Sequence, residues 1–150
     1  MSATTSDWGE RALGALAAEG HRIGGARKAV VDLLARQSCC RSAQEIADEL
    51  RERGDRVGIA SVYRTLDLLH GLALVQRVDV GEGGHRYEPV VPGGEHHHHA
   101  VCDSCGTLTP FEDRSLEQAL ERLSRRLGHR GAAHDVVIRG TCTRCKRRAA

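Results

Sequence analysis

Cysteine and histidine residues form the clearest chemical pattern in the sequence. Four consecutive histidines, residues 96–99, lead into a Cys-x-x-Cys pair formed by Cys102 and Cys105. A second such pair, Cys142 and Cys145, lies near the end of the 150-residue chain. Thiolates and imidazoles are preferred zinc ligands, and four thiolates form a closed tetrahedral site. The two pairs therefore predict one structural zinc ion held by all four cysteines.

Disulfides, redox chemistry and a purification tag are the alternative explanations of this pattern. Disulfides require an oxidising compartment. Residues 1–7 lack the features of a signal peptide, so we expect a cytoplasmic protein. A redox Cys-x-x-Cys motif explains one pair but not two. A tag lies at a terminus, whereas these histidines lie in the middle of the chain.

The histidine run reads as a strand that continues through Ala100 and Val101. Side chains alternate between the two faces of a strand, so His96 and His98 point one way, and His97 and His99 the other. One strand could therefore supply two separate metal sites. A solvated polar run is the alternative, disfavoured because imidazoles beside a zinc knuckle indicate metal binding.

The composition excludes some classes of function. No apolar run approaches 18 residues, so we expect no membrane-spanning helix. The net charge of +2 does not by itself indicate nucleic-acid binding. Residues 1–91 carry 12 Lys and Arg against 13 Asp and Glu. Any DNA contact must therefore come from the local placement of basic side chains.

The first half predicts helices over about 6–18, 26–36, 43–53 and 59–70, followed by a hairpin over 72–88 with a turn at 81–84. Ser6 is the expected cap of the first helix. Ser42 and Glu45 match the capping box that opens a helix. Gly71 is expected to stop the fourth helix. Helices followed by a hairpin are the order of a winged helix-turn-helix domain, in which the fourth helix would enter the major groove.

The fourth helix has an expected inner and outer face. Ile59, Val62, Leu66 and Leu69 are expected to face inward. Arg64 is placed to read guanine and Tyr63 to contact a thymine methyl. The full set of expected DNA contacts lies on this helix and the hairpin: Ser61, Tyr63, Arg64, Thr65, Arg77 and Arg86. An ordinary helical domain with a solvated arginine is the alternative.

The second half predicts an α+β domain. Residues 89–94 contain prolines and glycines and read as a hinge between a domain at 1–88 and a domain at 95–150. A short strand near 107–110, a helix over 112–127 and a strand over 135–140 separate the two cysteine pairs. Four leucines form the apolar stripe of that helix, either as core or as a dimer seam: Leu116, Leu120, Leu123 and Leu127.

These motifs together resemble the ferric-uptake-regulator family over about residues 20–146. The resemblance rests on residues 61–66, 86–88, 96–106 and 140–145. It implies a homodimeric, metal-activated bacterial transcriptional repressor that binds palindromic double-stranded DNA operators. The function implied is control of zinc or iron uptake genes, with zinc as structural metal and zinc or ferrous ion as regulatory metal.

The resemblance also implies ligand sets. Structural zinc falls on the four cysteines. A further metal site falls on His96, His98, Glu117 and His134. A sensing site between the domains falls on His97, His99 and Glu88. These histidine pairs are the same two strand faces that the alternation predicts.

The sequence departs from the family pattern at Cys40, where the iron-sensing branch has a histidine. Cys40 is either a soft ligand that completes the sensing site or a small buried residue. Glu88 stands where the peroxide-sensing branch uses aspartate, which disfavours that branch. The cysteine that the zinc-sensing branch often has before its histidines is absent from residues 91–93. Residues 1–19 lie largely outside the match.

Two other functions remain as alternatives. A zinc hydrolase needs an open metal position beside a general base. Glu117 or Glu88 could serve as that base, but the chain has no His-Glu-x-x-His motif, so we expect no enzyme activity. A metal-storage or chaperone module explains the ligands but gives the winged helix no role.

Overall fold

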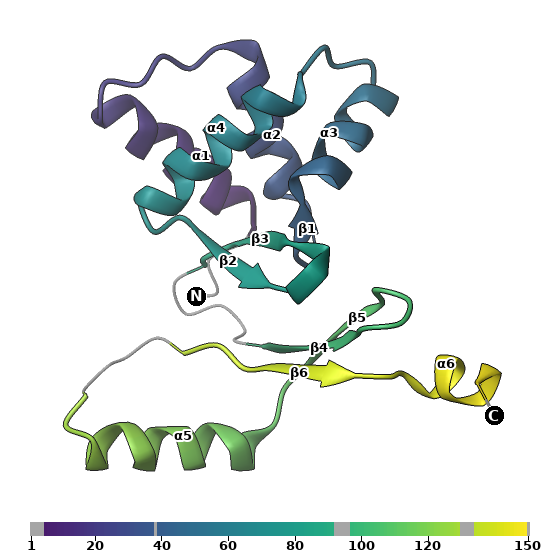
Figure 1. Cartoon of the computed structure of the whole chain (residues 1–150). Coiled ribbons are helices and arrows are strands. Elements are labelled where there is room, and N and C mark those ends of the chain that lie inside the picture. Colours follow the sequence, from purple (N-terminus) through teal and green to yellow (C-terminus); the bar gives the residue numbers. More distant parts are fainter. Residues whose placement is uncertain (1–4, 38, 92–96, 130–133, 150) are drawn as a thin grey trace. The chain divides into compact units, whose positions relative to one another are not determined.

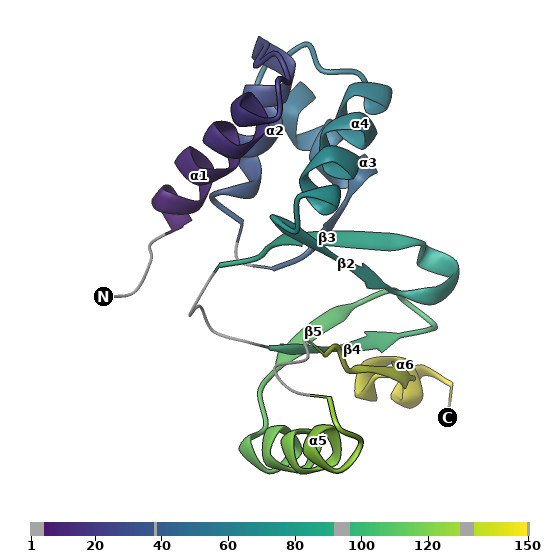
Figure 2. The same ribbon diagram turned by 90° about the vertical axis from the view of Figure 1, so that its left-hand side faces the viewer.

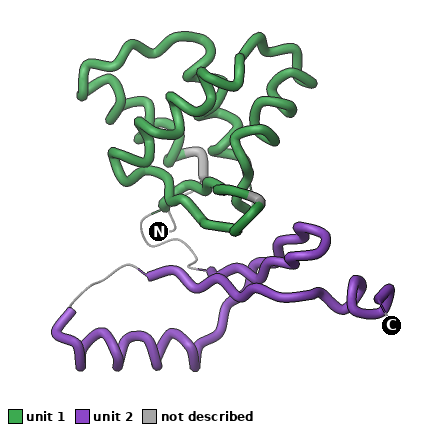
Figure 3. The backbone as a smooth tube through the Cα atoms, viewed as in Figure 1, with its two compact units in different colours: residues 1–95 green, residues 96–150 purple. Residues whose placement is uncertain are grey.

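The computed structural model describes residues 5–37, 39–91, 97–129 and 134–149. The chain divides into two compact units, Met1–Glu95 and His96–Ala150 (Figure 3). Helices and small sheets occur in both units, so the predicted α+β class is confirmed. His96 and residues 92–94 of the expected hinge lie outside the described residues. No described helix has the length and apolar character needed to cross a membrane.

The first unit has four helices on one side of a three-stranded sheet (Figures 1 and 2). Its elements are α1 (Thr5–Ala18), α2 (Gly25–Leu34), β1 (Arg41–Ser42), α3 (Ala43–Glu52), α4 (Ile59–Gly71), β2 (Val75–Asp79) and β3 (His85–Pro89). The helices from α2 to α4 followed by the β2–β3 hairpin confirm the winged-helix order. The chain begins α1 at Thr5, so Ser6 is inside the helix and is not its cap.

The core of the first unit joins all four helices through apolar side chains at helical spacing. Val30, Leu34, Ile46, Leu50 and Leu66 are buried, as their spacing predicted. No comparable sequence signal marks Trp8, which is fully buried from α1. Its indole Nε1 donates to the Leu74 carbonyl at 2.9 Å, so burial leaves no unpaired donor on this ring. The first helix is thus an integral part of this unit.

The start of α3 follows from Ser42, the predicted cap. The Ser42 hydroxyl accepts the Glu45 backbone N–H at 3.1 Å, and a Glu45 carboxylate oxygen accepts the Ser42 N–H at 2.8 Å. Two of the unpaired donors at the helix start are thereby satisfied. Ser42 also belongs to β1, which pairs with β3 in the register Ser42↔Arg86 and was not predicted.

The inner face of α4 is formed by Val62, Thr65, Leu66 and Leu69, all buried. These positions follow the i, i+3, i+4, i+7 stripe of a helix. Thr65, expected among the DNA contacts, therefore faces inward instead: it is 3% exposed, and its hydroxyl donates to the Ser61 carbonyl at 2.9 Å. Ile59, expected to face inward, is exposed in the first turn of the helix.

The end of α4 differs from the prediction that Gly71 stops it. Gly71 is the last residue of the helix rather than the first residue after it, and Ala73 adopts the left-handed conformation with φ 55°. The N–H of Leu74 donates to the Leu69 carbonyl and that of Ala73 to the His70 carbonyl. This pair of bonds is the Schellman ending, normally built around glycine.

The wing extends further than predicted. Pro89 is the last residue of β3, and the Val90 N–H donates to the Leu74 carbonyl at 2.9 Å. The Val90 carbonyl accepts from Arg11 Nη2 of α1 at 3.2 Å. The first two residues of the expected hinge are therefore fixed within the first unit.

The second unit contains a three-stranded sheet in the order β5-β4-β6 and two helices. Its elements are β4 (His98–Cys102), β5 (Leu108–Phe111), α5 (Arg114–Arg126), β6 (Val137–Gly140) and α6 (Thr143–Arg148). β4 is central, antiparallel to β5 and parallel to β6. No α5 residue is buried, and Leu127 at its end is 63% exposed. The core explanation of the leucine stripe is therefore wrong.

Candidate metal centres

The four cysteines converge at one end of the second sheet. Cys102 ends β4, Cys142 is the residue before α6, and Cys145 lies within α6. Their four Sγ atoms lie within 4.8 Å of one another, and Cys105 and Cys142 are separated by 3.8 Å. Zn–S bonds of about 2.3 Å in a tetrahedron give sulfur separations of about 3.8 Å. These residues therefore fit a zinc ion held by four thiolates.

The parallel pairing of β4 with β6 explains this convergence. Parallel strands end at the same edge of a sheet, so the cysteine pairs that follow them meet there. In the register, Cys102 lies opposite Gly140, and the Asp103 N–H donates to the Gly140 carbonyl at 2.8 Å. The Asp103 carboxylate also accepts from Arg139 at 3.2 Å. Both pairs are thus held together by the strands as well as by their sulfurs.

Two of the four sulfurs, those of Cys102 and Cys105, lie in an environment that favours the thiolate. The Cys142 N–H donates to Cys102 Sγ at 3.3 Å and lowers the pKa of Cys102. The Thr107 hydroxyl lies 3.1 Å from Cys105 Sγ and, with other donors, lowers the pKa of Cys105 to about 5. The pKa of Cys145 is raised to about 12, chiefly because its thiol is hydrogen-bonded to Cys105. Donors directed at sulfur stabilise the charged form that binds metal.

A second cluster lies on the same strand. His98 Nε2 is 2.5 Å from one carboxylate oxygen of Glu117, and His134 Nε2 is 3.0 Å from the other. His98 is only 1% exposed, and its ring lies 5.6 Å from that of Phe111. Two imidazoles and a carboxylate are a ligand set for a divalent transition metal. Three of the four residues predicted for this site are therefore together, and His96 lies outside the described residues.

His97 and His99 pair separately from His98. Their ring centroids are 4.9 Å apart, in an edge-to-face arrangement, and one nitrogen of each lies within 4.8 Å of the other. This confirms the predicted alternation for the three histidines that the structure describes. The strand therefore presents ligands for two different sites.

The remaining sensing ligands pair within the first unit. A Glu88 carboxylate oxygen and Cys40 Sγ lie within 4.8 Å of each other. The Gln76 side-chain amide donates to the Glu88 carboxylate across the β2–β3 pair. A hydrogen bond between Cys40 and Cys39, together with burial, raises the pKa of Cys40. The predicted sensing set is thus made of two close pairs, one in each unit.

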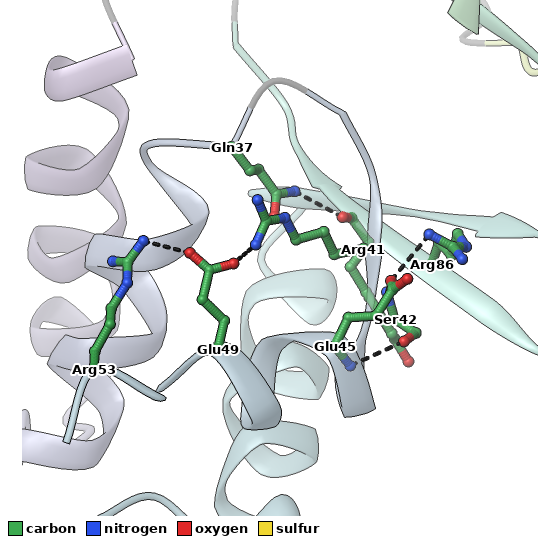
Figure 4. Close-up of polar contacts among 8 residues, drawn as sticks. Gln37, Arg41, Ser42, Glu45, Glu49, Arg53 and Arg86 are labelled. Atoms are coloured by element: carbon green, nitrogen blue, oxygen red, sulfur yellow. Dashed lines mark hydrogen bonds and ion pairs between the residues drawn. The ribbon is translucent and has the colours of Figure 1, made fainter. Parts of the chain in front are cut away.

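The outer face of α4 carries the expected base-reading residues. Tyr63 is 48% exposed, and the exposed Arg64 donates from Nη2 to the Ser61 hydroxyl at 3.2 Å. Arg77 is exposed on β2. Arg86, in contrast, is bound to Glu45 within the polar network shown in Figure 4. Ser61, Tyr63 and Arg64 therefore form one surface, from which Thr65 is absent.

Sequence reasoning missed several supporting residues. Gln76 holds Glu88, while Thr107 and Arg144 contact the Cys105 sulfur. For Arg144 a signal existed, since it lies inside the second Cys-x-x-Cys pair. For Gln76 it did not, because its contact depends on the register of the hairpin.

Comparison with known proteins agrees with this geometry. The model of the Ferric uptake regulator family matches residues 18–139. The ferric uptake regulation protein of Bacillus subtilis is 35% identical over 105 residues, covering 69% of this chain and 70% of that protein. The zinc uptake regulation protein of Mycobacterium tuberculosis is 35% identical over 132 residues, covering 87% of this chain and 99% of that protein.

Solved structures give the same result. The Helicobacter pylori ferric uptake regulator, described as having three functional metal binding sites, matches with a TM-score of 0.80 at 26% identity, covering 95% of this chain and 94% of that one. The Vibrio cholerae ferric uptake regulator matches with a TM-score of 0.73 at 28% identity, covering 85% of this chain and 97% of that one. Sequence, fold and ligand clusters agree, and the chain belongs to the ferric uptake regulator family.

Proposed function

We propose that this protein is a metal-responsive transcriptional repressor that binds palindromic DNA as a homodimer and controls zinc or iron uptake genes in the cytoplasm. The observation that carries this proposal is the pair of ligand clusters on β4, one of four cysteines and one of His98, Glu117 and His134, in a chain that also has a winged helix. A storage protein or a hydrolase would not need the winged helix.

Zinc is the regulatory metal that we favour. The similar zinc regulator of M. tuberculosis is covered over 99% of its length, whereas the similar iron regulator of B. subtilis is covered over 70%. A site of Cys40, Glu88, His97 and His99 would have four ligands, which suits tetrahedral zinc. With the two clusters of the second unit, this set makes three metal sites, the number named for the H. pylori regulator.

The homodimer is supported by the unburied face of α5. Leu123 and Leu127 are exposed, as is Ile138 on β6. Exposed leucines at helical spacing beside an open sheet are typical of an interface that a second copy covers. We therefore assign residues 95–150 to dimerisation and metal binding, and residues 1–88 to DNA binding.

The chain's own residues supply the proposed switch. When bound, a divalent ion gives the ligands a common rigid coordination centre. Glu88 and Cys40 would bind it from the wing side, and His97 and His99 from the start of β4, on either side of residues 89–94. This joint would restrict the winged domain to orientations in which both α4 helices meet half-sites one helical turn apart, about 34 Å. Metal and DNA affinities would then rise together.

Operator binding measured with and without metal tests this proposal. A palindromic site selected from random duplexes should be retarded by the protein with zinc or ferrous ion and much less after mild chelation. Cys102→Ser should lose about one zinc per chain and dimerise weakly, because a zinc ion held by four cysteines contributes to folding. Metal-independent binding, or full zinc content in Cys102→Ser, would contradict it.

A further inference from the structure

The Cys105 sulfur is the exposed member of the four-cysteine cluster. Cys102 is buried and Cys142 and Cys145 are partly covered, whereas Cys105 is open to solvent. A zinc ion with four thiolates carries a net charge of −2, and an exposed thiolate is the position that a chelator or an electrophile reaches first. The stability of such a site therefore depends on what covers this sulfur.

Two side chains are directed at this sulfur. The Thr107 hydroxyl lies 3.1 Å from Cys105 Sγ, and Arg144 Nη2 lies 3.8 Å from the same sulfur. Arg144 Nη2 also donates to the Thr107 hydroxyl at 3.3 Å. The guanidinium, the hydroxyl and the sulfur thus form a closed triangle of contacts.

The local structure explains why Arg144 reaches Cys105. Arg144 lies between Cys142 and Cys145, in the first turn of α6, so the turn that supplies two sulfurs also directs the arginine. Thr107 precedes β5, and its backbone carbonyl accepts the Cys102 N–H at 2.9 Å. Both contacts therefore come from segments that the ligands themselves hold in place.

The other cations of α6 do not share this position. Lys146, Arg147 and Arg148 are exposed, and no hydrogen bond or ion pair from their side chains is found among the described residues. Arg144 is the α6 cation that contacts a ligand. The neighbouring Lys146 therefore provides a control with the same charge and helix but without the contact.

We propose that Arg144, supported by Thr107, is a positioning residue of the four-cysteine centre that neutralises the exposed Cys105 thiolate and slows loss of zinc. This inference rests on the proposed function, in which the four cysteines hold zinc. The guanidinium offsets part of the −2 charge, and its bonds to the sulfur and the hydroxyl fix the Cys105 side chain. Residues that contact ligands in this way typically change metal affinity about 10–100-fold when removed.

Zinc transfer to a chromogenic chelator tests the proposal in the full-length protein, after mild chelation has removed exchangeable metal. Arg144→Gln should release its remaining zinc at least roughly tenfold faster than the parent. Lys146→Gln should match the parent. Arg144→Lys should recover much of the retention, since it keeps the charge, and Thr107→Val should be intermediate.

Salt separates a charge effect from a packing effect. Raising the ionic strength should reduce the difference in zinc-release rate between the parent and Arg144→Gln, because exposed charges are screened. N-ethylmaleimide followed by peptide mass spectrometry should modify Cys105 earlier in Arg144→Gln than in Lys146→Gln.

Equal zinc release from Arg144→Gln and Lys146→Gln would overturn the inference while leaving the assignment of zinc to the four cysteines intact. If Arg144→Gln folds poorly, the rates of zinc release from Thr107→Val and Arg144→Lys test the inference instead. A Thr107→Val protein that releases zinc as slowly as the parent would show that these contacts do not retain the metal. If Cys105→Ser instead kept the same tightly held zinc as the parent, the assignment of zinc to the four cysteines would itself be wrong.

Discussion

Arg86 of β3 donates to a Glu45 carboxylate oxygen at 2.9 Å, and that same oxygen accepts the Ser42 N–H at the start of α3. The wing is therefore fastened to the capping box of the helix before α4. Figure 4 shows this contact beside the ion pairs of Glu49 with Arg41 and Arg53. The Arg86 side chain is only 23% exposed, so the structure gives it a positioning role rather than that of a free phosphate contact.

Arg86→Ala is expected to lower both stability and DNA affinity. Loss of a partly exposed pair should cost about 0.5–1 kcal/mol of unfolding free energy. Arg77→Ala is the matched control, since Arg77 is exposed in the same hairpin. It should weaken operator and random DNA alike without changing the melting temperature. Identical melting temperatures for the two variants would remove the positioning role of Arg86.

Arg64→Ala is expected to reduce discrimination between DNA sequences. An arginine that reads a guanine contributes about 1–3 kcal/mol per half-site. Affinity for the selected operator should therefore fall by more than affinity for random DNA, as measured by gel retardation at fixed salt. Equal losses on both DNAs would show that Arg64 contacts phosphate only.

Cys40→Ser decides which metal the protein senses. If Cys40 completes the site, the zinc concentration needed for operator binding should rise at least about tenfold, because thiolates favour zinc. Operator binding against buffered free zinc and ferrous ion measures this. An unchanged zinc curve, with ferrous ion active at lower free concentration, would make Cys40 a packing residue and the protein an iron sensor.

Ala73→Gly is expected to stabilise the first unit by up to about 1 kcal/mol. Ala73 has a left-handed backbone, in which a Cβ is strained and glycine is not. Its side chain is exposed, so little packing is lost. Thermal unfolding should show a higher melting temperature, with Gly71→Ala as a comparison inside the helix. A lower melting temperature for Ala73→Gly would refute the strain.

Tyr87 gives the first unit a sensitivity to alkaline pH. Burial, followed by the nearby Asp67 charge, raises the pKa of Tyr87 above its usual value of 10. A raised pKa contributes stability that is full below pH 10 and is lost as the pH rises through the folded pKa. The parent should therefore lose more stability than Tyr87→Phe above pH 10. The rise in tyrosinate absorbance at the highest pH should be absent from Tyr87→Phe. If this rise persists in the variant, it belongs to Tyr63.

The sequence predicted the elements that local rules control. The capping box of Ser42 and Glu45, the stripe of Val62, Leu66 and Leu69, and the alternation of the histidines each depend on neighbours within a few residues. The Cys-x-x-Cys spacing likewise carries its own chemistry. These features required no knowledge of the tertiary fold.

Features that depend on distant segments could not be predicted in the same way. Trp8 is buried because α1 packs against α2 and α4, and β1 forms because β3 lies beside it. Thr65 reads as polar, yet its helical position turns it inward and its hydroxyl is satisfied by Ser61. Polarity alone was the wrong criterion there, since one hydrogen bond makes burial of a hydroxyl acceptable.

The central strand β4 carries His98 at one end and Cys102 at the other, four residues or about 13 Å apart. Both side chains lie on the same face because their spacing is even. Loss or gain of a single residue between them would turn one ligand to the opposite face, whereas a change of two would preserve the facing. The number of residues between the two ligands can therefore change only by an even number if both are to stay on one face. Relatives that keep both metal centres are expected to differ in the side chains of this segment rather than in its length.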